Sequence, residues 1–176
     1  EILIPVDFSG GKIEIYDDAK ITIAEGGSLS IDANNITFGT GSSIVVDGTL
    51  NLKLTEDFTV GSNFAKESKG KISCTDSFDF IIDTDFESPI NFDCTKNVTL
   101  ENNKTVSFGT IKANTFTNKG TTTVNSNLSV GTVTNNGTLT IKEDSEIKNF
   151  SNNGSAIVND SKTLKITKKF NNTVTL

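Results

Sequence analysis

The acidic side chains of this chain are densest in residues 76–93, which read DSFDFIIDTDFESPINFD. Because alternate side chains of a strand project from one face, Asp83, Asp85 and Glu87 would share a face. Asp79 would lie one corner away. Carboxylate oxygens grouped in this way bind hard cations, so the segment predicts a calcium site formed by these four residues. The alternative is an acidic face exposed to water, because the glycine-rich nonapeptide of calcium-binding repeats is not matched.

Neighbouring carboxylates can also hydrolyse glycosidic bonds. The chain has no His, Arg or Trp and a single Tyr, so few groups could bind a sugar or act as a general base. The same shortage counts against a polysaccharide lyase, which needs a strong base beside the abstracted proton. We therefore expect a protein that is not an enzyme, with no catalytic residue and no cofactor other than the calcium considered above.

The two cysteines, Cys74 and Cys94, occupy equivalent positions of a 20-residue repeat and would point inward. If the repeats stack at the spacing of paired strands, the two Cα atoms fall inside the disulfide window of roughly 4.4–6.8 Å. A disulfide between neighbouring turns is one expectation, and a pair of buried free thiols is the other. Neither cysteine is expected to be a nucleophile, because no His is present to generate the thiolate.

The elements that must position these residues are short strands. Apolar and polar residues alternate in runs that recur about every eight residues, and turn formers such as EGG, TGSS and DGT separate the runs. A longer repeat is superimposed on this alternation. The inward pattern of Leu52, Leu54, Phe58 and Val60 returns at Ile72, Cys74, Phe78 and Phe80, and again at Phe92, Cys94, Val98 and Leu100.

The length of the repeat changes along the chain. Upstream it lengthens to 22 or 23 residues, as from Ile13, Ile21 and Leu29 to Ile36, Ile44 and Leu52. Downstream it shortens to 17, as from Val133, Leu139 and Ile141 to Phe150, Ala156 and Val158. A barrel or sandwich of hairpins has no reason to repeat its inward pattern at such intervals, whereas a coil whose turns stack on one another requires it.

The sequence therefore predicts an all-β, single-stranded parallel β-helix of about eight rungs, each of 17–23 residues. We expect one domain over residues 1–176, with the rungs in 12–176 and a possible N-terminal cap in 1–11. The threonine-rich runs at 121–124, 132–134 and 138–140 suggest an ice-binding face, but the strand propensity of Thr explains them adequately. The open strand edges at the two ends must be capped or joined to something.

Three segments, 116–124, 133–141 and 150–158, share the pattern F/V-x-N-x-G-x-x-x-V/I. This pattern resembles the coils of bacterial autotransporter passengers and filamentous-haemagglutinin-type adhesins. The resemblance covers residues 12–176 in pattern and 106–170 in motif. It implies a right-handed parallel β-helix, an extracellular address and an adhesive or structural role.

Charge divides the chain into two parts. Residues 1–94 hold 17 acids and 6 Lys, a net charge of −11, while residues 95–176 hold 5 acids and 10 Lys, a net charge of +5. Because the whole chain carries −6, we expect no nucleic-acid partner. No apolar run is long enough to span a bilayer, so we expect no membrane insertion. The chain lacks Met, which suggests a removed leader or a piece of a larger protein, and we favour secretion.

Three functions are compatible with these features. The first is a secreted, cell-surface adhesin-like or structural module whose partner is a host or matrix glycan or protein. The second is a subunit that polymerises end to end with other copies of itself, the acidic half of one copy meeting the basic half of the next. The third and least favoured is a carbohydrate-active β-helix enzyme.

Overall fold

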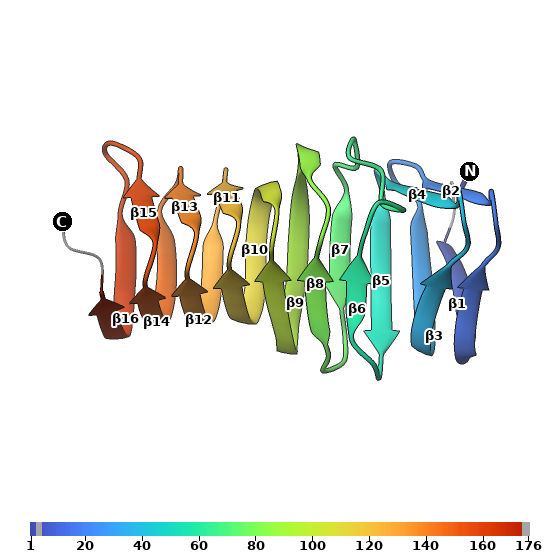
Figure 1. Cartoon of the computed structure of the whole chain (residues 1–176), viewed down its shortest axis with the longest axis horizontal. Helices are drawn as coiled ribbons and strands as arrows, with labels where there is room; N and C mark the ends of the chain where they lie inside the picture. Colours follow the sequence, from blue (N-terminus) through green and yellow to red (C-terminus); the bar gives the residue numbers. More distant parts are fainter. Residues whose placement is uncertain (3–4, 174–176) are drawn as a thin grey trace.

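The computed structural model is a β-solenoid of about eight turns whose strands stack in parallel along one axis (Figure 1). It describes the backbone of residues 1–2 and 5–173, and the side chains of all of these except 5, 87–88 and 95–98. The described residues contain no helix, and hence no helix long and apolar enough to cross a membrane. The predicted all-β parallel coil is confirmed, and its two ends lie at opposite ends of the long axis.

Sixteen strands build the coil. In chain order they are β1 Pro5–Ile15, β2 Lys20–Ile23, β3 Ser28–Phe38, β4 Ser43–Val46, β5 Thr49–Leu54, β6 Phe58–Val60, β7 Lys71–Cys74, β8 Asp79–Ile82, β9 Phe86–Asn102, β10 Thr105–Asn118, β11 Thr121–Val124, β12 Leu128–Asn135, β13 Thr138–Ile141, β14 Ser145–Asn152, β15 Ser155–Val158 and β16 Leu164–Asn172. Several of the longer strands turn a corner and so contribute to two faces of the coil.

Each turn passes through three walls in a fixed order. Wall 1 is the continuous parallel ladder β1-β3-β5-β7-β9-β10-β12-β14-β16. Wall 2 comprises β6, β8 and the C-terminal parts of β1, β3, β9, β10, β12, β14 and β16. Wall 3 comprises β2, β4, the first residues of β9 and β10, and β11, β13 and β15. Their inward side chains form one continuous core.

The predicted register is confirmed over most of the chain. Ile13 lies over Ile36, Ile72 over Phe92, Phe80 over Leu100, Val133 over Phe150 and Leu139 over Ala156. The side chain of Val98, expected over Phe78, lies outside the described residues.

Five predicted pairings are wrong by two residues. Leu29 pairs with Leu50 and not with Leu52, so this turn is shorter than predicted. The four pairings expected 20 residues after Leu52, Leu54, Phe58 and Val60 are also wrong, because the spacing there is 22, as in Leu52 with Cys74 and Phe58 with Phe80, so the next turn is longer. A slip of two residues leaves every side chain on the same face, so alternation alone cannot detect it. The stack also begins earlier than expected, because β1 starts at Pro5 and pairs with β3 through residues assigned to the cap.

The interior is a set of stacked columns. On wall 1 one column runs Phe8, Ile31, Leu52, Cys74, Cys94, Ala113, Val130, Ile147 and Ile166. Phenylalanine rings fill the middle of the coil, where the Phe80 ring lies 5.6 Å from that of Phe58 and 5.0 Å from that of Phe92, both in edge-to-face geometry. Stacking equal residue types lets each turn bury the apolar face of its neighbour.

A column of asparagines replaces the apolar side chains in the basic half of wall 2. The members are Asn102, Asn118, Asn135, Asn152 and Asn172, and the first three are fully buried. Each Nδ2 donates to the Oδ1 of the next member, at 3.3, 2.8, 2.7 and 2.9 Å in turn. We call this column the asparagine ladder. The Asn of the F/V-x-N-x-G pattern is its building block, because each amide in the middle of the column hydrogen-bonds the turns on both sides.

The glycine of the same pattern lies at the corner between walls 2 and 3. A Cβ added to Gly137 would lie 2.0 Å from the carbonyl oxygen of Gly120, and one added to Gly154 would lie 2.1 Å from that of Gly137. Successive backbones therefore approach too closely at this corner for any side chain. The regular recurrence of Asn-x-Gly has two causes, a buried amide and a close backbone contact.

Candidate functional site

The acidic segment is divided between strand β8, strand β9 and the corner that joins them, so its acids do not lie on one strand. Strand β8 ends at Ile82 and β9 begins at Phe86, so the expectation of one strand carrying Asp83, Asp85 and Glu87 is wrong. Asp83 Oδ1 lies 3.4 Å from Nζ of Lys104, which is on the next turn of the coil. Asp85 Oδ1 accepts the backbone N–H of Thr105 at 2.8 Å. These carboxylates therefore stabilise the corner that joins walls 2 and 3.

The described members of the predicted calcium site do not gather. Asp79 lies on β8, and its backbone N–H donates to Asp57 Oδ1 at 3.1 Å. The side chain of Glu87 lies outside the described residues. Among the side chains that the structure describes, no three His, Cys, Asp or Glu lie close enough together to hold a metal ion. The geometry of the described residues supplies no calcium cage.

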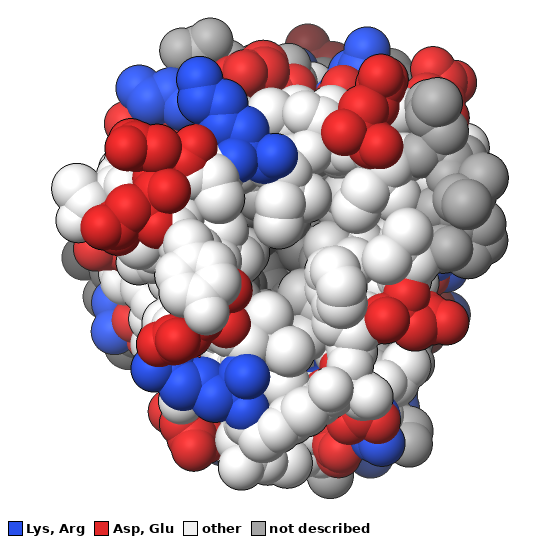
Figure 2. All heavy atoms as spheres, turned by 90° about the vertical axis from the view of Figure 1, so that its right-hand side faces the viewer, with Lys and Arg blue, Asp and Glu red and all other residues white. Residues whose placement is uncertain are grey.

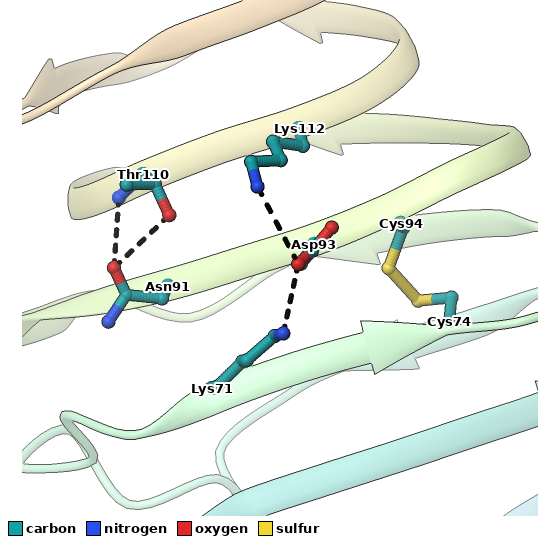
Figure 3. A network of polar contacts seen from close by, with 7 residues as sticks. All are labelled: Lys71, Cys74, Asn91, Asp93, Cys94, Thr110 and Lys112. Carbon is teal, nitrogen blue, oxygen red and sulfur yellow. Dashed lines mark hydrogen bonds and ion pairs between the residues drawn. A yellow bond between two sulfur atoms is a disulfide. The ribbon is translucent and has the colours of Figure 1, made fainter.

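Cys74 and Cys94 form a disulfide inside wall 1 (Figure 3). Their Cα atoms lie 4.5 Å apart on neighbouring turns, and both side chains are buried. The bond therefore cross-links β7 to β9 from within the core. Its chemistry is structural, since a buried disulfide offers no thiolate to a substrate.

A polar network joins the same turns from the outside. Asp93 projects from β9 between two lysines, 2.9 Å from Lys71 Nζ and 3.9 Å from Lys112 Nζ (Figure 3). Beside it, Asn91 Oδ1 accepts hydrogen bonds from the backbone N–H and the hydroxyl of Thr110, at 3.1 and 3.2 Å. Three successive turns are thus linked where the acidic half of the chain meets the basic half. All of these side chains have partners that keep them in place.

Further ion pairs connect successive turns at the surface. Lys53 Nζ lies 2.7 Å from Asp32 Oδ2, and this hydrogen bond raises the pKa of Lys53 above its usual value. Lys162 is hydrogen-bonded to Glu143 in the same way, with the same effect on its pKa. Lys53 is exposed and Lys162 is half-buried at the surface, and such surface pairs contribute little to stability. Neither pair resembles a reactive centre.

The most regular outward-facing feature is a set of hydroxyl and amide rows on both sides of the Asn-x-Gly corner, and most of their side chains are half-buried. On wall 3 the two outward rows are Thr105, Thr121, Thr138, Ser155 and Ser107, Thr123, Thr140, Ile157. On wall 2 they are Thr115, Thr132, Asn149 and Thr117, Thr134, Ser151. We call these four rows the threonine face. Its members carry no charge, and Ile157 is the one apolar member, but the wall 2 rows continue into Glu101 at one end and Lys169 at the other.

At the level of the sequence the threonine runs are explained by strand propensity, although the 17-residue repeat already places Thr121 over Thr138 and Thr115 over Thr132. The Thr123 and Thr140 hydroxyls make no hydrogen bond within the described residues, so their donors and acceptors are available to a ligand. Along a strand the outward positions repeat at about 6.6–6.8 Å, and between turns at about 4.7–4.9 Å. The signal that could have found this face is the repeated Thr-x-Thr on either side of Asn-x-Gly.

The N-terminal end is hollowed (Figure 2). A cavity of about 370 Å³ opens there, with Phe8, Ile13, Tyr16, Ala19 and Ile21 among its lining residues. Charged side chains surround this apolar centre. Two hollows that share lining residues with it are larger, one of about 500 Å³ beside Tyr16 and Asp17 and one of about 410 Å³ beside Asp7 and Lys53. The hollow of about 240 Å³ between Lys112 and Glu146 is more polar.

Comparison of the chain with models of protein families, with characterised proteins and with solved structures finds no match. A function must therefore be inferred from the geometry of the threonine face, the disulfide and the two ends of the stack.

Proposed function

We propose that this chain is a non-enzymatic, extracellular β-solenoid module that binds an extended polar partner, such as a matrix glycan or protein, through the threonine face. The supporting observation is the registered array of uncharged hydroxyl and amide groups on two adjoining walls. A hydroxyl both donates and accepts hydrogen bonds, which suits a partner that is itself rich in hydroxyl or amide groups. Because the array has no charge, binding to it needs no charged partner.

Rigidity favours this use of the surface. The asparagine ladder and the disulfide hold successive turns from inside, and ion pairs hold them from outside. A surface held in place loses little conformational entropy on binding, so even weak individual hydrogen bonds contribute to affinity. An extended partner would contact several turns at once, and its contacts would add along the axis.

The disulfide supports an extracellular address. Buried disulfides form and persist in oxidising compartments and are rare in reducing ones. The residue types on the threonine face also agree with binding more than with turnover, since the chain has no His that could activate their hydroxyls. Adhesion by surface complementarity is therefore the function that these features support best.

The double variant Thr123→Val/Thr140→Val tests the proposal. Valine keeps the shape and strand propensity of threonine and removes only the hydroxyls. Loss of two hydrogen bonds, at about 0.5–1.5 kcal/mol each, predicts binding that is roughly 5- to 150-fold weaker. Binding of the whole chain to immobilised neutral and sulfated glycans, collagen and laminin would be measured by surface plasmon resonance.

The matched control is Thr22→Val/Thr37→Val, which makes the same change on walls 3 and 2 outside the threonine face. This control should bind like the original protein, and circular dichroism should show that both variants keep the fold. Equal binding by the two variants, or no binding of the original protein to any of these probes, would contradict the proposal.

A further inference from the structure

The large apolar side chains exposed on the described part of the molecule are confined to the ends of the stack. They are Phe8 and Tyr16 in the first turn and Ile157 and Phe170 in the last strands of walls 3 and 2. Phe8 is 45% exposed and Phe170 is 55% exposed, while their counterparts in the middle turns are buried. Apolar surface concentrated at two places marks contacts with another molecule.

The two ends also differ in charge. Residues 5–27 contain five acids and two lysines, a net charge of −3, and Figure 2 shows acidic side chains around the apolar centre of this end. Residues 159–173 contain one acid and four lysines, a net charge of +3. An apolar centre with an acidic rim at one end therefore has its complement at the other end. Such complementarity steers two surfaces into one relative orientation.

The strand register indicates which residues of the two ends would meet. One outward row of wall 1 runs Asp7, Ser30, Asn51, Ser73, Asp93, Lys112, Ser129, Glu146 and Lys165. If a further turn continued this row beyond Lys165 and that turn were the first turn of another copy, Asp7 would follow Lys165. By the same rule, Phe8 would lie over Ile166 in the core column, and Val6 would lie over Leu164.

We infer that the acidic N-terminal face of one copy stacks on the basic C-terminal face of a second copy, continuing the parallel ladder of wall 1. The exposed edge of β16 would pair with the exposed edge of β1, an addition of one strand to the edge of a sheet. The contact joins two different surfaces, so it does not close on itself and yields linear chains of molecules. This inference does not depend on the threonine face.

Two variants, each blocked at one end, test the direction of assembly. Phe8→Asp places a charge at the centre of the N-terminal face, and Phe170→Asp places one in the C-terminal face beside Phe150. Sedimentation velocity of the whole chain should show open-ended oligomers that grow with concentration, while each variant alone should remain monomeric. An equimolar mixture of the two should form dimers and nothing larger, because one unblocked face of each kind remains.

A surface change provides a second test that leaves the core untouched. Asp7→Lys would put two lysines next to each other at the junction with Lys165 and should reduce association at least tenfold. Ser129→Lys, in the same outward row but in the middle of the stack, is the matched control and should leave association unchanged. A monomeric original protein at every concentration, dimers that do not grow, or equal effects of the two lysine variants would overturn the inference.

Discussion

Replacing Asn135 with Ala should lower the free energy of unfolding far more than the same replacement at the adjacent Asn136. Asn135 accepts a hydrogen bond from Asn118 Nδ2 at 2.8 Å and donates to Asn152 Oδ1 at 2.7 Å and to the carbonyl oxygen of Ser155 at 2.8 Å. Loss of these three buried hydrogen bonds predicts a cost of about 3–4 kcal/mol, because the abandoned partners cannot reach water. The Asn136 side chain is exposed and accepts one bond, from Asn153 at 2.9 Å, so its loss should cost less than about 1 kcal/mol.

Urea unfolding followed by circular dichroism measures both values, and amide hydrogen exchange localises the effect. Exchange should accelerate in β11 to β15, the strands around the broken ladder, while β5 and β7 stay protected. Converting Asn118, Asn135 and Asn152 together to Val should cost more than the single Asn135→Ala change, because the carbonyl oxygens of Thr138, Ser155 and Gly154 then all lose their donors. Equal destabilisation by Asn135→Ala and Asn136→Ala would refute the idea that the buried amide column holds these turns together.

Three further outcomes are expected. Cys74→Ser/Cys94→Ser should lose about 3 kcal/mol of unfolding free energy, because the disulfide closes a 20-residue loop, and reduction of the original protein should match this in the same urea assay. Gly137→Ala should cost about 1–3 kcal/mol in thermal unfolding because its Cβ meets a backbone oxygen, whereas Gly11→Ala, which meets nothing within 4 Å, should be nearly neutral. Asp93→Asn should cost less than about 1 kcal/mol, and the difference should shrink in urea titrations at high salt, because its two lysine partners are half exposed. A cost for Asp93→Asn that does not depend on salt would argue against a simple surface ion pair.

The strands and their stacking could be predicted from sequence because both depend on the alternation of apolar side chains. Strict alternation places Ile13, Ile36 and Ile72 on the inward face whatever the length of the corners. The register could be predicted only where the corner length stays constant. Between Leu52 and Cys74 the turn is longer by two residues, and a two-residue slip changes no side chain from inside to outside.

The candidate site was harder to predict because asparagine and aspartate can either form a corner or serve as a buried or ligating group. Asparagine is a turn former, so Asn135 shortly before a glycine indicates a corner, and nothing local indicates that its amide is buried and paired. Aspartate behaves likewise. Asp83 and Asp85 look like ligands on one strand, but Asp83 pairs with Lys104 in a corner of the next turn and Asp85 accepts a hydrogen bond from Thr105 at the start of β10. Only the three-dimensional register decides between the two roles.

The change of residue type in wall 2 follows from the change in turn length. The interior column contains Val60 and Ile82 and then switches to Asn102, where the sequence spacing between successive members of the column becomes shorter. The corner after Ile82 has three residues, whereas the corner after Asn118 has two, Lys119 and Gly120.

In the shorter corners, carbonyl oxygens just beyond the bend accept from the buried amides, as Thr138 accepts from Asn118 at 2.9 Å and Ser155 from Asn135 at 2.8 Å. An isoleucine in the column would leave those oxygens without this donor. The long turns can therefore keep an apolar interior, while the short turns need an asparagine at the inner side of the bend. A glycine follows at the tip in the corners after Asn118, Asn135 and Asn152, whereas the corner after Asn102 is Asn103-Lys104.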